Sequence, residues 1–323
     1  MSALQTRYKA LSQSSLFVPV ALAALLVVAN IVLQPSFLRP HVIRSNLLTF
    51  SPLILVAMGQ AVILIGGNLD LSMGFGISLL NCFIAMNMSV VPGAMGHNAA
   101  ILGAGLAIAL GMGAANGILV GMLRVPSFMA TFATSFIWLG VAIMIAPIPG
   151  GAVPRWFAQF FKASFGPANV MLLVVVLSAL AWYVVRRYRL GRYIYAIGSS
   201  WDASYANGIP VNRITIGSYA VGWCFVYLGT LALTAQTRAG DSAIGEPFAL
   251  NSIAAAVIGG VSLSGGSGSP VGAIFGAITL SIVMNIIYFS GLPTSYQVLV
   301  RGLIIIAALG STIVVRSAEA SRS

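Results

Sequence analysis

Apolar runs of about 20 residues follow one another along almost the whole chain, with only short polar stretches between them. An α-helix rises about 1.5 Å per residue, so each run can cross the roughly 30 Å hydrocarbon core of a bilayer. Only 7% of the 323 residues are charged, whereas a soluble domain carries about 25%. Because a water-soluble surface cannot be built from so few charges, the sequence predicts an all-α, polytopic integral membrane protein. Residues 1–323 are expected to form a single transmembrane domain.

Ten segments have the length and composition of membrane spans. They are residues 15–33, 46–66, 71–91, 99–122, 128–147, 169–185, 214–235, 250–264, 271–290 and 295–315. Almost no polar residue separates the second from the third, and the eighth is short and rich in glycine. We therefore expect about ten transmembrane helices with Gly-rich broken or re-entrant segments; nine spans, or re-entrant segments in place of two of them, are the alternatives. No small-residue cleavage site follows the first run, which favours a retained helix over a signal peptide.

The 16 basic residues predict how the helices are oriented. They lie mainly at the ends of the apolar runs, which is the positive-inside pattern of membrane proteins and not a nucleic-acid-binding patch. With the N-terminus inside, ten basic residues lie inside and five outside, and Arg301 lies within the last segment. The inside set is Arg7, Lys9, Arg124, Arg186, Arg187, Arg189, Arg192, Arg213, Arg316 and Arg322; the outside set is Arg39, Arg44, Arg155, Lys162 and Arg238. We expect both termini in the cytoplasm and no nucleic-acid partner.

The residues that most enzyme chemistries require are missing. The two cysteines, Cys82 and Cys224, lie in apolar runs, and the two histidines lack the spacing of metal ligands. No nucleophile and base stand in a recognisable arrangement, and no G-x-x-x-x-G-K-[ST] phosphate-binding loop occurs. We therefore expect a protein that is not an enzyme, with no catalytic residue, no metal site and no cofactor of its own.

The segment IGGNLDLSMG, residues 65–74, holds Asp70, the only acidic residue before Asp202. Glycines let a helix break, and a broken helix is stable in a membrane only where its backbone lines a cavity or is buried in protein. An intramembrane carboxylate indicates a functional site. The alternative is structural, with Asp70 as the N-cap of a cytoplasmic helix start. The solute pathway or gate predicted here comprises Gly66, Gly67, Asn68, Asp70, Ser72 and Gly74.

A second Gly-rich segment, IAAAVIGGVSLSGGSGSPVG, covers residues 253–272. Its small residues recur every third or fourth position, which allows helices to approach closely. Ile-Gly-Gly occurs at 258–260 as it does at 65–67, with Leu-Ser a few residues later in both places, but so short a match does not establish a repeat. The run 265–268 must be a turn or a broken helix. The pathway or gate residues predicted here are Gly259, Gly260, Ser262, Ser264, Gly265 and Gly266.

The longest polar stretch on the predicted inside is the loop 186–213. Turn residues at Gly198 and Gly208 enclose a short predicted helix, on which Trp201 and Tyr205 are four residues apart and share a face. Exposed aromatic side chains on a polar loop are typical anchors for a protein partner. Trp and Tyr also concentrate in the lipid headgroup belt. The residues alone favour these two interpretations about equally.

Four regions of the chain, in order, resemble ribose-type sugar permeases of ABC importers, the inner-membrane components of binding-protein-dependent transport systems. GGNLDLSMG at 66–74 resembles their SGGIDLSVG, and VPSFMATF at 125–132 resembles their P-x-F-x-x-T segment. GRYIYAIG at 191–198 and NGIPVNR at 207–213 resemble their cytoplasmic loop. IAAAVIGGVSLSGGSGS at 253–269 resembles their IAAVVIGGTSLSGGRGS. Order and spacing agree from about residue 45 to residue 310, nearly the whole chain.

Three places depart from that pattern. Asn68 replaces a glycine, and because Asn also adopts the left-handed conformation, the turn is expected to survive. The stretch 199–202 reads Ser-Ser-Trp-Asp where Gly-Asn-Glu-Glu is common, and 249–251 reads Ala-Leu-Asn where Glu-Leu-Asp is common. The last two changes remove carboxylates, so the resemblance names neither the sugar nor the partner subunit.

The resemblance implies a permease subunit of an ABC importer in the bacterial cytoplasmic (inner) membrane, which moves a sugar or sugar-like solute inward by alternating access. The implied partners are a second permease subunit, identical or different, a cytoplasmic ABC ATPase that binds the ATP, an extracytoplasmic solute-binding protein and membrane lipid. The binding protein would dock on the side of the predicted outer loop 236–249, which holds Asp241 and Glu246. The cytoplasmic loop would couple to the ATPase through Arg192, Tyr193, Gly198, Trp201, Asp202, Ala203, Tyr205, Asn207, Gly208, Ile209 and Arg213.

Two other functions fit the same features. Related ABC permeases for nucleosides or branched-chain amino acids share the architecture that the resemblance implies. A self-contained secondary transporter or channel would use Asp70 as its proton or ion site. The second alternative differs in its energy source, because a secondary transporter works as a single chain under an ion gradient, whereas a permease subunit needs its ATPase and ATP.

Overall fold

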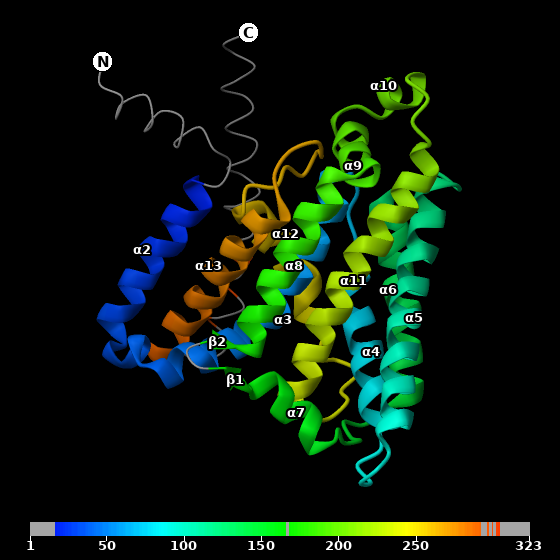
Figure 1. The fold of residues 1–323 in the computed structure, drawn as a ribbon. Helices are drawn as coiled ribbons and strands as arrows, with labels where there is room; N and C mark the ends of the chain where they lie inside the picture. The colour runs from blue at the N-terminus through cyan, green and yellow to red at the C-terminus, as the bar shows by residue number, and fades with distance from the viewer. Residues whose placement is uncertain (1–16, 166–167, 292–295, 297–298, 300–301, 304–323) are drawn as a thin grey trace, which may run out of the picture.

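The computed structural model describes residues 17–165, 168–291, 296, 299 and 302–303 (Figure 1). In this part of the chain the structure is helical apart from one antiparallel pair of two-residue strands, β1 (Ser164–Phe165) and β2 (Ala168–Asn169), with Ser164 opposite Asn169. The α-helices are α2 (Phe17–Leu33), α3 (Pro40–Ile65), α4 (Met73–Asn87), α5 (Met95–Gly121), α6 (Ser127–Ile145), α7 (Arg155–Lys162), α8 (Val170–Arg187), α9 (Arg189–Ser199), α10 (Trp201–Ala206), α11 (Val211–Thr237), α12 (Glu246–Ile258) and α13 (Pro270–Phe289), and a 3-10 turn, η1, covers Pro35–Leu38.

Six of the described helices are long and apolar enough to cross a membrane, namely α3, α5, α6, α8, α11 and α13. Three shorter apolar helices, α4, α12 and the stretch Pro19–Leu33 of α2, correspond to the remaining predicted spans. The tenth predicted segment, 295–315, falls almost entirely outside the described residues. The all-α prediction is therefore confirmed for the described residues, whereas the count of about ten spanning helices is not.

The bundle has two ends, which we name the α10 end and the α7 end after the short helices that lie there (Figure 1). The described basic residues of the two predicted sets lie at opposite ends, because the helices that carry or adjoin them alternate in direction. Arg124, Arg186, Arg187, Arg189, Arg192 and Arg213 lie at the α10 end; Arg39, Arg44, Arg155, Lys162 and Arg238 lie at the α7 end. The separation agrees with the predicted spans, and the assignment of either end to the cytoplasm remains a prediction.

Helix α11 forms the centre of the bundle and packs against α3 and α5. Glycines bring α3 and α11 together, because a Cβ placed on Gly59 would lie 2.5 Å from the carbonyl oxygen of Gly222. The fully buried Trp223 of α11 fills the space left by two more glycines. A Cβ on Gly76 of α4 would lie 2.2 Å from its ring, and one on Gly113 of α5 would lie 2.7 Å from it.

Two helices begin inside the bundle after non-helical segments that enter from opposite ends. Residues 66–72 lead inward from the α10 end to α4, which has only 15 residues and lies in the half of the bundle nearer α7 (Figure 1). Residues 238–245 lead inward from the α7 end to α12, which has 13 residues. The first turns of the two helices meet, since the amide of Gly245 donates to Ser78 Oγ at 2.9 Å and a Cβ on Gly74 would lie 3.0 Å from Ala249 Cβ.

The second of these breaks corrects the sequence prediction. Residues 236–249 were expected to form an outer loop, but residues 240–245 run back along α4, so that Gly240 lies against Cys82 and the amide of Asp241 donates to Asn81 Oδ1 at 2.9 Å. Glu246 is accordingly the first residue of α12 and not a loop residue. The predicted span 250–264 also ends early, because the helix stops at Ile258 before the glycine pair.

Candidate functional site

Asp70 lies on the non-helical segment between α3 and α4 and is completely buried. Its carboxylate accepts hydrogen bonds from the amide and the hydroxyl of Ser72, at 2.8 and 2.7 Å. Trp223 Nε1 of α11 donates to it at 2.9 Å, and Asn116 Nδ2 of α5 donates at 3.3 Å. Four donors from three parts of the fold therefore converge on one carboxylate, and such charge-assisted hydrogen bonds are among the stronger ones in proteins.

The backbone around Asp70 is hydrogen-bonded by side chains instead of by a helix. The amide of Leu69 donates to Ser127 Oγ at 3.2 Å, and the Leu69 carbonyl accepts from the Tyr219 hydroxyl at 3.0 Å. The amide of Leu71 donates to Thr131 Oγ1 at 3.1 Å. In the amide orientation that satisfies both of its atoms, Gln60 donates to the Asp70 carbonyl at 3.0 Å and accepts from the Asp70 amide at 3.2 Å. Irregular backbone is tolerated at membrane depth only with partners of this kind.

The predicted role of Asp70 as an N-cap is wrong, because Ser72 occupies the N-cap position of α4. The carboxylate binds the Ser72 amide from two residues away and is held in the interior by α5 and α11. Asn116, which the sequence places within a span, serves as the interhelical hydrogen-bonding residue expected of such a position. No pattern in the sequence predicts the contacts of Gln60, Tyr219 or Trp223 with this segment, because they depend on how the helices pack.

The two Ile-Gly-Gly motifs form the same helix-ending turn. Gly66 and Gly259 have φ and ψ of −72° and 3°, and of −71° and 3°. Gly67 and Gly260 follow in the left-handed region, with φ of 78° and 82°. In both turns the second residue after the cap donates to a carbonyl five residues back, as in a Schellman motif. The turn forms with Asn68 present, as expected, but its left-handed residue is Gly67 and not Asn68.

The first of these turns and the glycines at 265 and 266, which follow the second turn, meet α9 at the α10 end. A Cβ on Gly198 of α9 would lie 1.8 Å from the Ile65 carbonyl oxygen, and one on Gly265 would lie 2.7 Å from Gly67 Cα. The Gly266 amide donates to the same Ile65 carbonyl at 2.9 Å. The structure thus joins part of the predicted pathway set to part of the predicted coupling set. Gly198 lies inside α9 and is not the turn residue that the sequence predicted.

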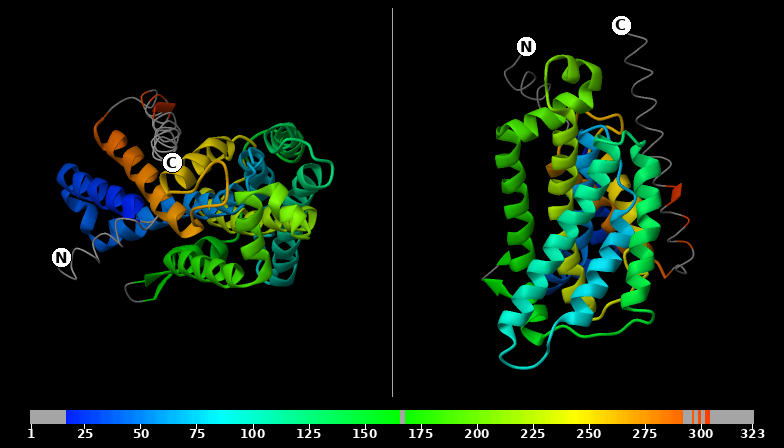
Figure 2. Two further views of the ribbon diagram at one scale, coloured as in Figure 1. Left: turned by 90° about the horizontal axis from the view of Figure 1, so that it is seen from above. Right: turned by 90° about the vertical axis from the view of Figure 1, so that its right-hand side faces the viewer.

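The short helix predicted in the polar loop is α10. Ser200 caps it, since its hydroxyl accepts from the Ala203 amide at 3.2 Å, and Gly208 with φ of 74° follows it. Trp201 and Tyr205 stack with ring centroids 5.3 Å apart and are 40% and 62% exposed. The Arg124 guanidinium lies 5.4 Å from the centre of the Trp201 ring. Helix α10 therefore carries an exposed aromatic pair beyond the ends of the long helices (Figures 1 and 2).

The other predicted coupling residues surround this helix. Arg192 and Tyr193 lie in the first half of α9, Asp202 and Ala203 lie on α10, the turn 207–209 follows it, and Arg213 lies in the first turn of α11. Of the remaining pathway residues, Ser262 and Ser264 lie in the turn between α12 and α13, with their hydroxyl oxygens 2.9 Å apart.

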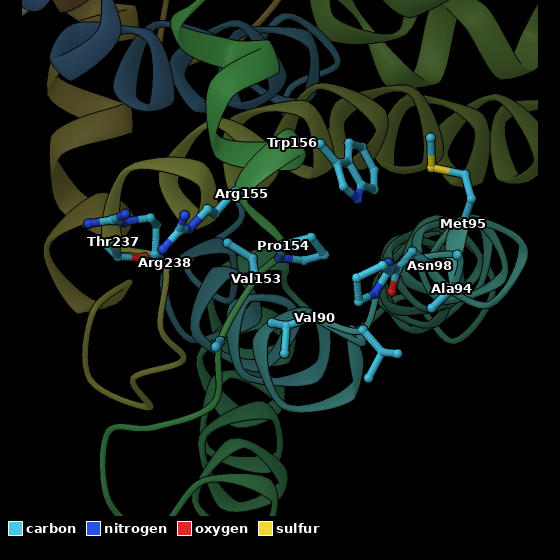
Figure 3. A pocket seen from close by; sticks show the side chains of 14 residues that line it. Val90, Ala94, Met95, Asn98, Val153, Pro154, Arg155, Trp156, Thr237 and Arg238 are labelled. Carbon is cyan, nitrogen blue, oxygen red and sulfur yellow. The ribbon is translucent and has the colours of Figure 1, made fainter.

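Each end of the bundle has a cavity, and Asp70 lines neither of the two. The cavity at the α10 end has a volume of about 440 Å³ and extends from Asn68 to Trp201, past Arg124 and Thr215. The cavity at the α7 end has a volume of about 850 Å³ (Figure 3). Figure 3 shows that Trp156, Met95, Arg155 and Arg238 are among the side chains that line it.

Residues 42–309 match the protein family described as "Branched-chain amino acid transport system / permease component". The chain belongs to this family. The match runs from the first turns of α3 past the end of α13, so the matched residues include Asp70, both Ile-Gly-Gly turns and α10.

Relatives of this permease chain are sugar permeases. The ribose import permease protein RbsC of Escherichia coli (strain K12) is 31% identical over 90% of this chain and 91% of its own length. The ribose import permease protein RbsC of Bacillus subtilis (strain 168) is 31% identical over 88% of both chains. The galactose/methyl galactoside import permease protein MglC of Haemophilus influenzae is 27% identical over 96% of this chain and 97% of its own. No solved structure matches the chain.

Proposed function

We propose that this chain is the membrane-spanning permease subunit of a binding-protein-dependent ABC importer that moves a sugar or sugar-like solute inward by alternating access. The observation that carries the proposal is the family match over residues 42–309, together with relatives that transport ribose, galactose and allose. Permeases for nucleosides or branched-chain amino acids remain the rivals for the solute, and the family's own description names the latter. A self-contained secondary transporter has no support from these relatives.

The proposed partners are a second permease subunit, a cytoplasmic ABC ATPase and an extracytoplasmic solute-binding protein. Helix α10 is the proposed contact with the ATPase, because it presents two stacked aromatic rings beyond the long helices. Helix α9 precedes α10 and packs directly against the backbone at the end of α3, because Gly198 has no side chain. Movement of α10 would therefore be transmitted to the turn that precedes Asp70.

The decisive experiment is reconstitution of the permease with its ATPase and binding protein in liposomes. We expect uptake of a sugar that requires ATP and both partners. Uptake by the permease alone under an ion gradient would contradict the proposal, and ATP-dependent uptake of a branched-chain amino acid or a nucleoside in place of a sugar would correct the solute.

Coupling is tested by the double variant Trp201→Ala with Tyr205→Ala. Two aromatic anchors at an interface contribute about 2 kcal/mol or more each, so the variant should insert normally but lose the ATPase or its stimulation. The chain offers a matched control in Trp156→Ala with Phe160→Ala, an exposed aromatic pair at the same spacing on α7 at the opposite end. If the α10 variant keeps unchanged ATP hydrolysis and uptake, the two rings are not coupling anchors.

We also propose that the α10 end and both termini face the cytoplasm, on the strength of the ten basic residues counted inside against five outside. An impermeant thiol reagent should label Trp201→Cys in inverted vesicles and leave it unlabelled in intact cells. Labelling from outside intact cells would reverse the orientation.

A further inference from the structure

Glu246 lies deep between the two ends of the bundle. Residues 240–245, which precede it, run along α4 from Cys82 to Gly74. A Cβ on Gly245 would lie 2.0 Å from the Gly74 carbonyl oxygen. From Gly74 to Asn87, the last residue of α4, the helix rises about 20 Å. Glu246 follows directly as the first residue of α12, so it lies near the middle of a membrane that the bundle spans.

The Glu246 side chain is exposed on the surface of the single chain. Pro247 and Leu250 on the same face of α12 are exposed as well, and Leu250 is 55% exposed. The opposite face of α12 packs against α3, α4 and α13. A carboxylate that faced hydrocarbon at this depth would be strongly destabilised, and such groups face protein or water-filled space. A glutamate side chain is also too short to reach the headgroups.

The described part of the chain contains no positive charge at this depth. Every described arginine and lysine lies at the α10 end or the α7 end. Among the described residues no basic side chain therefore lies at this depth to neutralise the carboxylate. The solute path of the proposed permease would provide the water-filled space that a carboxylate at this depth needs.

Aromatic side chains adjoin this face. The first turn of α4 lies between α12 and α6, with Gly74 against Ala249 of α12 and Phe75 against Phe136 of α6. Phe136 continues into a ladder with Phe132 and Phe128, whose rings are 5.1 and 6.0 Å apart in succession and about half exposed. Binding sites for small solutes combine apolar and aromatic walls with a few polar groups that fix orientation.

We infer that Glu246 lines the solute path on the face turned toward the second permease subunit, and that its carboxylate accepts hydrogen bonds from hydroxyl groups of the transported solute. This inference rests on the proposed function. A carboxylate offers acceptors only, which match the O–H donors of a polyhydroxylated solute. The aromatic ladder of α6 provides apolar walls for the C–H faces of the same solute.

Access from water is the first test, carried out on the reconstituted importer. A hydrophilic, membrane-impermeant thiol reagent should modify Glu246→Cys, and a saturating concentration of the transported solute should slow the modification. Leu177→Cys is the matched control, because Leu177 is 53% exposed and lies midway along the membrane-facing helix α8. The wild-type chain gives the background from Cys82 and Cys224.

Equal modification at both positions, or none at position 246, overturns the inference. If the reagent modifies position 246 and the solute does not slow the reaction, the proposed hydrogen bond between Glu246 and the solute is refuted.

Transport kinetics supply the second test. Glu246→Ala should raise the KM for the solute by roughly tenfold and Glu246→Gln by less, because Gln retains one acceptor. A structural defect would affect all solutes alike, so the decisive quantity is the ratio of kcat/KM between the solute and a deoxy analogue, which should fall in the variants. An unchanged ratio overturns the inference. Failure of the wild-type importer to transport any sugar would instead refute the proposed function, so the two failures are distinguishable.

Discussion

The two Ile-Gly-Gly turns of this permease begin alike and continue differently. Both end a helix with the same dihedral angles and the same pair of backbone hydrogen bonds. After the first turn the chain enters the bundle, where side chains of α3, α6 and α11 bind its backbone and bury Asp70. After the second turn the chain stays at the α10 end, closes on itself through the Gly265 amide and the Ser262 carbonyl, and starts α13 with a Ser269 cap.

The difference separates what the local sequence determines from what the tertiary structure determines. A helix-ending turn needs only a glycine in the left-handed region and carbonyls of its own helix, so the same short sequence forms it twice. The path after the turn depends on donors and acceptors supplied from elsewhere. The backbone of the segment at 66–72 is bound by side chains of three helices. The segment at 261–269 is partly exposed and combines bonds within itself with bonds to the rest of the chain, from the Gly266 amide to the Ile65 carbonyl and from the Tyr195 hydroxyl to the Gly268 carbonyl.

The largest effect is expected from Asp70. Asp70→Ala leaves Trp223 Nε1 and the Ser72 amide without their acceptor, at a cost of about 1–3 kcal/mol each, and Asp70→Asn keeps one acceptor and should cost less. We expect Asp70→Ala to lower the thermal unfolding midpoint of the purified permease and to impair uptake more than Asp70→Asn does. If both variants unfold and take up solute as the wild type does, Asp70 contributes neither to the stability of the first segment nor to transport.

The next effect tests the place where the first turn meets α9 and the segment 261–269. Gly198→Ala would put a methyl group 1.8 Å from the Ile65 carbonyl oxygen and 2.5 Å from the Gly266 amide nitrogen. Both neighbours are backbone atoms, so overpacking should cost about 3 kcal/mol and disturb the first turn and the segment 261–269. Gly140→Ala is the control, because nothing lies within 4 Å of that position on α6. A Gly198→Ala protein as heat-stable as the Gly140→Ala protein would show that α9 and the turns are not in contact.

A smaller effect on stability is expected to distinguish residues 66–72, which the bundle encloses, from residues 261–269, which are partly exposed. Thr131→Val keeps the shape of the side chain but leaves the Leu71 amide without its partner, at a cost of about 2 kcal/mol. Ser264→Ala on the exposed turn should change the free energy of unfolding by less than about 0.5 kcal/mol. Equal losses, measured by unfolding in denaturant, would mean that the two segments depend on side-chain hydrogen bonds to the same degree.

The smallest effect should be the same in both turns. Gly67→Ala and Gly260→Ala each place a side chain in the left-handed region, which costs about 1 kcal/mol. We expect thermal unfolding midpoints for the two variants that agree closely with each other. A clear difference between them would mean that the tertiary surroundings, and not the turn itself, determine the stability of at least one cap.

The sequence by itself determined the features that depend on local physics. Apolar run lengths predict where the membrane helices lie, and aromatic spacing puts Trp201 and Tyr205 on one face of a short helix. These features need only the chain's own backbone and near neighbours, so a short stretch of sequence carries them.

Only the tertiary structure decided which distant residues meet. The enclosure of Asp70 needs Trp223 from 153 positions away. The inward course of residues 238–245 needs Asn81 and Ser78 to bind its amides, and no composition signal distinguishes that segment from an outer loop. Glu246 reaches the middle of the membrane for the same reason. Buried backbone groups take whatever partner the packed helices bring within reach, and that choice is a property of the whole bundle.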